Sequence, residues 1–337
     1  MNAKIGTRFN SENRTRLETV IPLETPYLLF VDPSSVCNLK CIFCPCGGAY
    51  KENWSNNKRV NLLPYSDYRE IIAQTLDFPQ KIKTLRLYKE GEPLMNKRLP
   101  DMIQYAKKRE VAGDIDFTTN GTLLNPDLNF ALIDAGVDRM NISIEALDEG
   151  GYEKNAGLKI DYKKFLKNLR HLYQNKGQCH ILMKISDVGL GKHSEQDFFE
   201  MFGDMCDEMA IEHITPVWPE FNLEEKIDKD FEQGIYGNTI RDMKVCPHIF
   251  YSICVNSDMS VSACLMDWNH YNIIGNLKEN TLKELWSGEK MNNMRILNLK
   301  GRRKELGICA NCGQLPYAAL DNLDPYADML LRKLENK

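Results

Sequence analysis

The chain has 337 residues, enough for one large domain with an appendage or for two modest domains. Its formal net charge is −4 and it has no basic block, which argues against nucleic acid as a partner. No apolar run approaches the roughly 20 residues of a membrane span, and the polar start does not resemble a signal peptide, so we expect a cytoplasmic protein without a membrane partner.

Residues 1–26 carry mixed charge without a sustained period, which predicts an N-terminal extension that packs on the next domain or frays. From residue 27 onward, short apolar runs alternate with segments of helical spacing. This alternation is typical of parallel βα units, so we expect an α/β fold with a partial barrel of six units over residues 27–221. In such folds ligands bind beyond the carboxyl ends of the strands. The predicted strands are 27–31, 84–88, 115–119, 139–144, 180–185 and 211–217, and the predicted helices are 65–76, 97–109, 126–135, 162–173 and 195–209.

Eleven cysteines in a chain expected in the cytoplasm argue against disulfides and for metal binding. The first group follows the first predicted strand, where Cys37, Cys41 and Cys44 form a CxxxCxxC run. Three thiolates this close on one loop can hold three irons of a [4Fe–4S] cluster and leave the fourth iron open to a small molecule. Cys46 lies two residues further on. It is either a competing ligand or, as we favour, a small buried hydrophobe.

The CxxxCxxC run resembles the motif of the radical S-adenosylmethionine (radical SAM) superfamily. The resemblance implies that the open iron chelates the amino and carboxylate groups of SAM. Reductive cleavage then yields methionine and a 5′-deoxyadenosyl radical, which abstracts a substrate hydrogen. The resemblance also places Phe43, the aromatic residue before the third cysteine, beside the adenine of SAM.

A charged turn after the second strand resembles a motif of the same superfamily. By themselves Gly91, Glu92 and Pro93 indicate only a turn with a charged residue. They resemble the GGEP motif, in which backbone groups and the acidic side chain receive the ammonium of SAM. Glu90 stands where the first glycine of that motif usually does.

The third and fourth strands also end in polar residues. Asn120 precedes a glycine, which by itself indicates a tight turn, and Ser143 and Glu145 by themselves indicate a strand end with an exposed carboxylate. Both segments resemble the superfamily's strand-end signatures. That resemblance implies that Asn120 belongs to the SAM site and that Ser143 and Glu145 hydrogen-bond the ribose and methionine parts of SAM.

Two charged residues at later strand ends are catalytic candidates. Lys184 ends the fifth run, where it either neutralises a carboxylate of SAM or substrate or extends from the barrel rim into solvent. Glu220 follows the sixth run and is either a base at the mouth of the barrel or an exposed loop acid.

The second cysteine group follows an acidic, polar segment, 222–242, which we interpret as a linker. Two short apolar runs around a turn at 256–258 predict a β-hairpin, which would bring Cys246 and Cys264 together. Cys309 and Cys312 come from a later CxxC loop. Four thiolates suit zinc or a second [4Fe–4S] cluster, and spacing alone does not decide between them.

The order of these features resembles the shortened SPASM, or twitch, domain, which binds one auxiliary [4Fe–4S] cluster. We therefore predict a small β-hairpin and helix domain at 243–322, two clusters in the whole chain, and a C-terminal helix over 323–337. No cysteine follows Cys312, so we expect no further cluster. Cys254, on the hairpin, is either a core residue or a thiol at the barrel mouth that gives a hydrogen atom to a substrate radical.

These features together predict a radical SAM enzyme, an oxidoreductase or epimerase, that abstracts hydrogen from a small polar metabolite such as a sugar, cyclitol or nucleotide sugar. An external donor such as flavodoxin or ferredoxin would supply the electron. The first strand begins too early for an N-terminal recognition module, which disfavours the alternative of a peptide- or protein-modifying enzyme. A two-cluster electron carrier is the alternative outside enzymes, and it would not need the strand-end residues.

Overall fold

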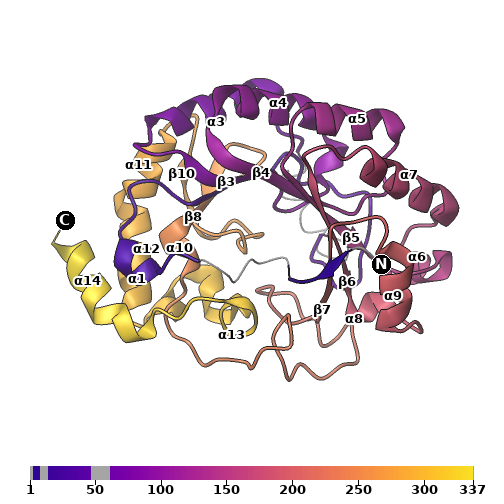
Figure 1. The fold of residues 1–337 in the computed structure, drawn as a ribbon. Coiled ribbons are helices and arrows are strands. Elements are labelled where there is room, and N and C mark those ends of the chain that lie inside the picture. The colour runs from indigo at the N-terminus through magenta and orange to yellow at the C-terminus, as the bar shows by residue number, and fades with distance from the viewer. Residues whose placement is uncertain (1–2, 8–13, 47–60, 337) are drawn as a thin grey trace.

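The computed structural model describes residues 3–7, 14–46 and 61–336. Its described strands form one ten-stranded sheet in the order β1-β7-β6-β5-β4-β3-β2-β8-β9-β10 (Figure 1). Strands β2 to β7 are parallel neighbours in sequence order, which confirms the predicted partial barrel of six parallel units. These strands are β2 Leu28–Val31, β3 Ile82–Arg86, β4 Ala112–Thr119, β5 Arg139–Ile144, β6 His180–Ser186 and β7 Glu208–Glu212.

Helices cover the outer face of this sheet (Figure 1). Side-chain caps set several of their starts, because Asn125, Asp161 and Ser194 each accept a hydrogen bond from a backbone N–H of the first turn. The outer helices are α3 Tyr65–Gln74, α4 Leu99–Arg109, α5 Pro126–Asp134, α6 Glu149–Ala156, α7 Tyr162–Gln174, α8 Asp187–Leu190 and α9 Glu195–Phe202.

The sixth unit differs from its prediction at both boundaries. The helix α9 ends at Phe202 instead of 209, and β7 covers Glu208–Glu212 instead of 211–217. The strand ends at Glu212 because the next two N–H groups bond outside the sheet: His213 donates to the carbonyl oxygen of Ile235 at 2.8 Å and Ile214 to the carboxylate of Asp187 at 3.1 Å. The shift changes which acidic residue ends the strand: it is Glu212 and not Glu220.

Segments from both ends of the chain extend the sheet at its two edges. The strand β1, Lys4–Ile5, pairs in parallel with β7, and Leu17 of the short helix α1, Leu17–Val20, is buried. At the other edge β8, Ser252–Val255, lies parallel to β2, and β9, Ser260–Ser262, returns antiparallel to β8. The strand β10, Ile273–Asn276, completes the sheet.

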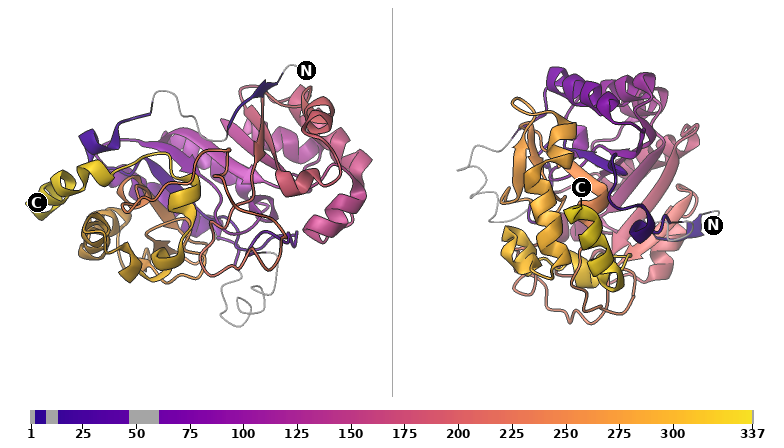
Figure 2. Two further views of the ribbon diagram at one scale, coloured as in Figure 1. Left: turned by 90° about the horizontal axis from the view of Figure 1, so that it is seen from below. Right: turned by 90° about the vertical axis from the view of Figure 1, so that its left-hand side faces the viewer.

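The predicted hairpin is thus confirmed, but its strands continue the barrel sheet instead of forming a separate one. The division of the chain at 222–242 stays a prediction. Helices of the C-terminal region gather beside this end of the sheet (Figure 2). They are α10 His248–Tyr251, α11 Leu282–Ser287, α12 Glu289–Leu299, α13 Gln314–Ala318 and α14 Ala327–Glu335.

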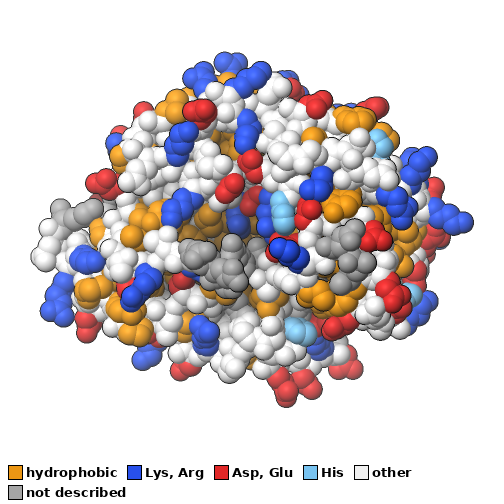
Figure 3. Space-filling view, in the orientation of Figure 1, with side chains coloured by type: hydrophobic (Ala, Val, Ile, Leu, Met, Phe, Trp, Pro, Cys, Tyr) orange, Lys and Arg blue, Asp and Glu red, His pale blue; other side chains and the backbone are white. Residues whose placement is uncertain are grey.

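The strand β2 shows how the sheet separates core from cavity. Leu29 and Val31 are buried in the core, whereas Leu28 and Phe30 line the interior cavity described below. Side chains alternate between the two faces of a strand, so the sheet places one set against the helices and the other against the cavity. No helix among the described residues is long and apolar enough to cross a membrane. On the face shown in Figure 3, acidic and basic side chains are interspersed and neither dominates.

Candidate active site

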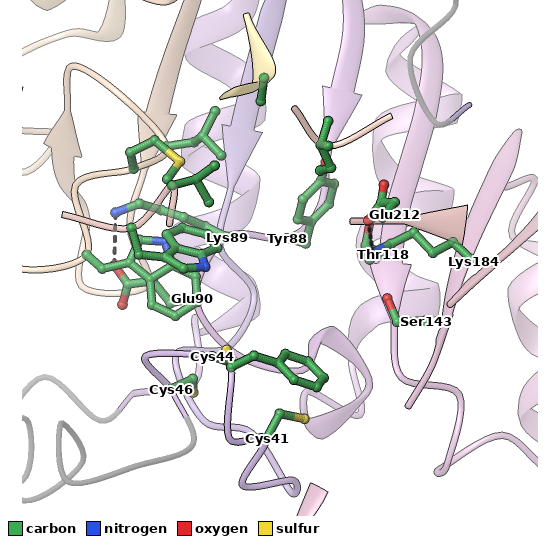
Figure 4. Close-up of a pocket in the computed structure, with 18 of the residues that line it drawn as sticks. Cys41, Cys44, Cys46, Tyr88, Lys89, Glu90, Thr118, Ser143, Lys184 and Glu212 are labelled. Atoms are coloured by element: carbon green, nitrogen blue, oxygen red, sulfur yellow. Dashed lines mark hydrogen bonds and ion pairs between the residues drawn. The ribbon is translucent and has the colours of Figure 1, made fainter. Parts of the chain in front are cut away.

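A cavity of about 520 Å³ lies at the carboxyl ends of the parallel strands. Residues at or just beyond the ends of β3 to β7 line it, and the cysteine loop closes one side (Figure 4). This position agrees with the expectation that ligands of such a fold bind beyond the strand ends. The strand-end residues that line the cavity include Arg86, Thr118, Thr119, Ser143, Lys184 and Glu212.

The first cysteine group lies on this cavity as one loop. Cys37, Cys41, Cys44 and Cys46 all line it, together with Phe43. The helix α6 holds the loop in place, because the backbone N–H groups of Lys40 and Ile42 donate to its last residues at 2.8 and 2.9 Å. Three thiols therefore face a common space, as ligands of one cluster must.

The environment of the Cys37 sulfur suits a thiolate. The backbone N–H of Leu39 donates to it at 3.4 Å and the amide of Asn120 at 3.9 Å. A hydrogen bond with Cys46 lowers the pKa of the Cys37 thiol, whereas burial raises that of Cys41. Donors aimed at a sulfur stabilise its negative charge, so this loop fits the cluster that the sequence predicts.

The turn after β3 packs directly on the cysteine loop. The N–H groups of Gly91 and Glu92 donate to the carbonyl oxygens of Ser34 and Val36 at 3.0 and 2.9 Å. A Cβ atom at position 91 would collide with both of these oxygens, so only glycine fits there. The close backbone approach therefore occurs at Gly91 and not at Glu90.

The carboxylate of Glu92 accepts three hydrogen bonds from groups of the chain itself. It accepts hydrogen bonds from the hydroxyl of Thr119 at 2.6 Å and from the N–H groups of Asn120 and Leu94 at 2.8 and 3.0 Å. Burial nevertheless raises the pKa of Glu92 to about 7. Glu92 thus ties the turn to the end of β4, and Pro93 begins the short helix that follows.

Ser143, Glu145 and Lys184 meet on the β5 and β6 side of the cavity. Burial raises the pKa of Glu145, and the nearby charge of Lys184 opposes that change. The ammonium of Lys184 donates to Glu212 at 2.7 Å, and the hydroxyl of Tyr236 donates to the other oxygen of Glu212 at 2.6 Å (Figure 4). The sequence did not single out Glu212, because the predicted strand ran past it.

The second cysteine group lines a smaller pocket next to the first. Its walls include Cys246, Cys264, Cys309 and Cys312, and burial raises the pKa of the last three to about 12 and that of Cys246 as well. A bound metal would replace those protons. Donors again point at sulfur: the N–H of Met266 reaches Cys264 at 3.5 Å and the amide of Asn272 reaches Cys309 at 3.6 Å.

Three residues, His248, Met266 and Gln314, line both the large cavity and the smaller pocket, so the two cysteine groups share a wall. Within the described part of the chain, no three His, Cys, Asp or Glu side chains converge on a point that could hold a single metal ion. That arrangement is compatible with polynuclear clusters, in which each thiolate binds its own iron.

Two catalytic candidates do not reach the cavity, and both placements correct the expectation of a group at the barrel mouth. Cys254 has no exposed surface, because it packs in the sheet near Lys89 and Asp267. Glu220 is exposed, lies outside the cavity lining and accepts a hydrogen bond from Asn269 at 2.6 Å. Of the three candidates, only Lys184 lines the cavity.

Aromatic and charged residues that the sequence did not single out complete the wall. Trp218 and Trp268 pack with ring centroids 4.5 Å apart and cover Cys46, which supports the interpretation of that thiol as a buried residue. Arg86 and Tyr88 line the opposite part. Trp218 and Trp268 are 50 positions apart in the chain, so no local pattern pointed to the pair.

Two protein-family models match the regions of the chain that carry the two cysteine groups. The family model described as "Radical SAM superfamily" matches residues 31–205, more than half of the chain, and one described as "Iron-sulfur cluster-binding domain" (SPASM) matches residues 246–313. Those findings favour an auxiliary cluster over zinc at the second cysteine group.

Curated relatives match part of the chain. A "Probable GTP 3′,8-cyclase" of Methanococcus maripaludis is 38% identical over 119 residues, which cover 35% of this chain and 36% of that protein. The GTP 3′,8-cyclase of Aliarcobacter butzleri is 31% identical over 173 residues, 51% of this chain and 50% of that one. The matches thus span about a third to a half of the relatives' length.

Solved structures share the fold. BtrN in complex with AdoMet and 2-DOIA has a TM-score of 0.54 at 16% identity, covering 88% of this chain and 97% of that chain. SuiB of Streptococcus suis bound to S-adenosylmethionine has a TM-score of 0.60, also at 16% identity, covering 89% and 74%. At such identity the likeness shows the fold alone.

The relatives correct the predicted reaction. Their names describe ring closure in GTP, which contradicts the prediction of oxidation or epimerisation of a sugar, cyclitol or nucleotide sugar. They also give no support to the peptide- or protein-modifying alternative. The match to an enzyme superfamily likewise overturns the alternative of a two-cluster electron carrier.

Proposed function

Because the chain belongs to the radical SAM superfamily, we propose that it removes a hydrogen atom from a small molecule bound in the cavity between its two cysteine groups. A purine nucleotide, with GTP as the first candidate, is the substrate class that the named relatives suggest. The observation that carries the proposal is that one cavity is lined by the first cysteine group and shares a wall with the pocket of the second.

The cofactors of this chain are SAM, a SAM-binding [4Fe–4S] cluster and an auxiliary cluster. We assign the first cluster to Cys37, Cys41 and Cys44. The auxiliary cluster belongs to the four thiols of the smaller pocket, Cys246, Cys264, Cys309 and Cys312. A reduced cluster with SAM bound supplies a 5′-deoxyadenosyl radical that removes hydrogen from a C–H bond. The electron comes from an external donor such as flavodoxin or ferredoxin.

The protein's own residues bind and orient SAM at the first cluster. Gly91 permits the turn to approach the cysteine loop, and Glu92 fixes that turn to β4 through three hydrogen bonds. Phe43, Asn120, Ser143 and Glu145 line the same part of the cavity and are the proposed contacts of SAM. Because hydrogen bonds hold the turn at Gly91 and Glu92 in place without a ligand, this part of the site is preorganised for binding.

The remaining wall suits a nucleotide. Tyr88 and Trp218 offer aromatic faces on which a base can stack. Besides Lys89, which pairs with Glu90, the cavity wall carries Arg14, Arg86 and Lys184 as cations that phosphates would meet. Each of these cations already has a carboxylate partner, respectively Asp321, Asp116 and Glu212, so phosphate binding would compete with those pairs.

The test is anaerobic turnover of the reconstituted protein with SAM, a reductant and GTP, ATP or no nucleotide. We expect GTP to accelerate formation of 5′-deoxyadenosine and to yield a product of altered mass. Deuterium on the ribose of GTP should appear in the 5′-deoxyadenosine. If no nucleotide alters the rate and no deuterium is transferred, the proposed substrate class is wrong.

A further inference from the structure

A buried group of charges stands beside the proposed SAM turn. The ammonium of Lys89 donates to the Oε1 atom of Glu90 at 2.9 Å, and His270 lies 2.7 Å from the same oxygen. The side chains of Lys89, Glu90 and His270 are 0%, 3% and 7% exposed. Lys89 also donates to Asn256 at 2.6 Å. We call Lys89, Glu90 and His270 the charge cluster.

One end of the charge cluster belongs to the turn that packs on the cysteine loop. Glu90 directly precedes Gly91, and its backbone N–H donates to the carboxylate of Asp32 at 3.3 Å. Glu90 and Lys89 both line the large cavity, and Figure 4 shows them on its wall, joined by an ion pair. Glu90, which stands where the motif usually has its first glycine, is therefore the residue that supplies the negative charge of the cluster.

The other end reaches the second cysteine group through a series of hydrogen bonds made by residues of one short loop, 265–272. Lys89 donates to the carbonyl oxygen of Asp267 at 2.9 Å, and the carboxylate of Asp267 accepts from the N–H of Asn272 at 2.9 Å. The side-chain amide of Asn272 then donates to the sulfur of Cys309 at 3.6 Å. His270 belongs to the same loop, which begins after Cys264.

Such a cluster is costly to build, because charges removed from water lose much of their hydration free energy unless they pair well. His270 also has a left-handed backbone, with φ of 56°, which non-glycine residues seldom adopt. Inside a protein, charges act on each other over longer distances than in water. A new charge in the turn would therefore act on the loop whose last residue, Asn272, donates to the sulfur of Cys309.

We propose that Lys89, Glu90 and His270 are positioning residues that couple the SAM turn to the auxiliary cluster, so that a cation entering the turn alters the hydrogen bond between Asn272 and Cys309. The proposal rests on Cys309 as a ligand of that cluster and does not depend on the identity of the substrate. Hydrogen bonds to ligand sulfur tune the reduction potential of a cluster. Added positive charge favours the reduced form, so the coupling should raise the potential.

The experiment is a redox titration of the auxiliary cluster, followed by electron paramagnetic resonance, in the reconstituted full chain. The probe is an uncleavable SAM analogue in which a protonated amine replaces the sulfonium. The wild type should show a higher auxiliary potential with the analogue than without it. His270→Asn should reduce this difference, because asparagine tolerates the left-handed backbone but is too short to reach Glu90 and hold it in place.

Two matched variants separate coupling from mere stability. His270→Gln restores a donor for Glu90 and should recover the difference, whereas a structural defect would not be rescued in this way. His193→Gln alters a histidine and carboxylate pair of similar length, 3.0 Å to Asp148, which joins the segments that follow β5 and β6 and does not involve the turn at Glu90. It should behave as the wild type.

The proposal is overturned if the analogue leaves the wild-type auxiliary potential unchanged, or if His270→Asn keeps the full difference. If the asparagine variant does not take up the auxiliary cluster, Asn272→Ala replaces it. That change breaks the path at its last bond and leaves the charge cluster intact, and the same loss of the difference is expected.

Discussion

The two cysteine groups of this protein differ in how the chain assembles them and in the size of the space that they face. The first group is a single loop, residues 37–46, that opens on the large cavity. The second is gathered from three separate parts of the chain into its own small pocket, where burial raises the pKa of the thiols. Three thiols facing a cavity leave room for a ligand, and four thiols in a closed pocket do not.

The sizes of the two spaces indicate which cysteine group has room for a bound ligand beside its proposed cluster. The cysteines of the first group share their cavity with Glu145 and Lys184, as the proposed binding of SAM and a substrate requires. The pocket of the second group meets the large cavity at His248, Met266 and Gln314, so an electron passing between the two proposed clusters would cross this wall. The following substitutions test whether the two cysteine groups have these different roles, and they are given in order of decreasing expected effect.

Loss of one thiol from the open loop should abolish the reaction. We expect Cys41→Ala to reduce formation of 5′-deoxyadenosine to background, because the proposed cluster needs three thiolates to hold three of its irons. Chromatography of the quenched reaction measures the product. Cys179→Ala, in which an isolated buried cysteine is removed, is the control and should retain cleavage. Cleavage by Cys41→Ala at the wild-type rate would refute the assignment.

Loss of the closed site should separate cleavage from product formation. Cys309→Ala/Cys312→Ala should lose one of the two clusters and the product of the complete reaction, while dithionite still drives cleavage of SAM. Iron and sulfide analysis together with the 5′-deoxyadenosine assay tests this expectation. An unchanged iron content in the double variant would contradict it.

The contact between the turn and the open loop should be sensitive to a single methyl group. In Gly91→Ala the added carbon would collide with the carbonyl oxygens of Ser34 and Val36, so the turn must shift. We expect cleavage of SAM to fall by about 100-fold, the usual effect of a small misplacement of an ordered site. Gly150→Ala, in α6, has space for the same carbon and should match the wild type. Equal rates for both would show that the turn does not position SAM.

The smallest effect concerns stability. The pKa of Glu92 is raised to about 7 in the folded protein from an ordinary value of 4.5, so the folded state holds a proton that the unfolded state releases. The free energy of unfolding should therefore fall by about 3 kcal/mol in total as the pH rises between these two values. Above them it should stay level. Urea unfolding across this range should show a weaker pH dependence for Glu92→Gln. An identical pH dependence of stability in the variant would show that the pKa of Glu92 is not raised in the folded protein.

Local spacing sufficed to predict the first cysteine group and the parallel strands. The three cysteines from Cys37 to Cys44 are close in the sequence, and the strands repeat one simple pattern. The close approach of Gly91 also followed a recognisable motif, although only the structure showed that this glycine, and not position 90, makes the contact.

The remaining features depend on long-range packing. Taking β7 to continue past Pro216 put Glu220 at the mouth of the barrel, whereas the strand ends at Glu212, which lines the cavity. The parallel pairing of β8 with β2 and the contact of Glu90 with His270 join residues far apart in the chain. No periodicity or spacing encodes such contacts, so sequence patterns could not reveal them.

The central claim, an open cluster that binds SAM beside a closed one that does not, is tested most directly by Mössbauer spectroscopy of the reconstituted protein with and without SAM. We predict two [4Fe–4S] clusters, with SAM changing the signal of one iron site in one of them. That change should persist in Cys309→Ala/Cys312→Ala and vanish in Cys41→Ala. A single cluster, or a change that depends on Cys309 and Cys312 instead, would contradict the account.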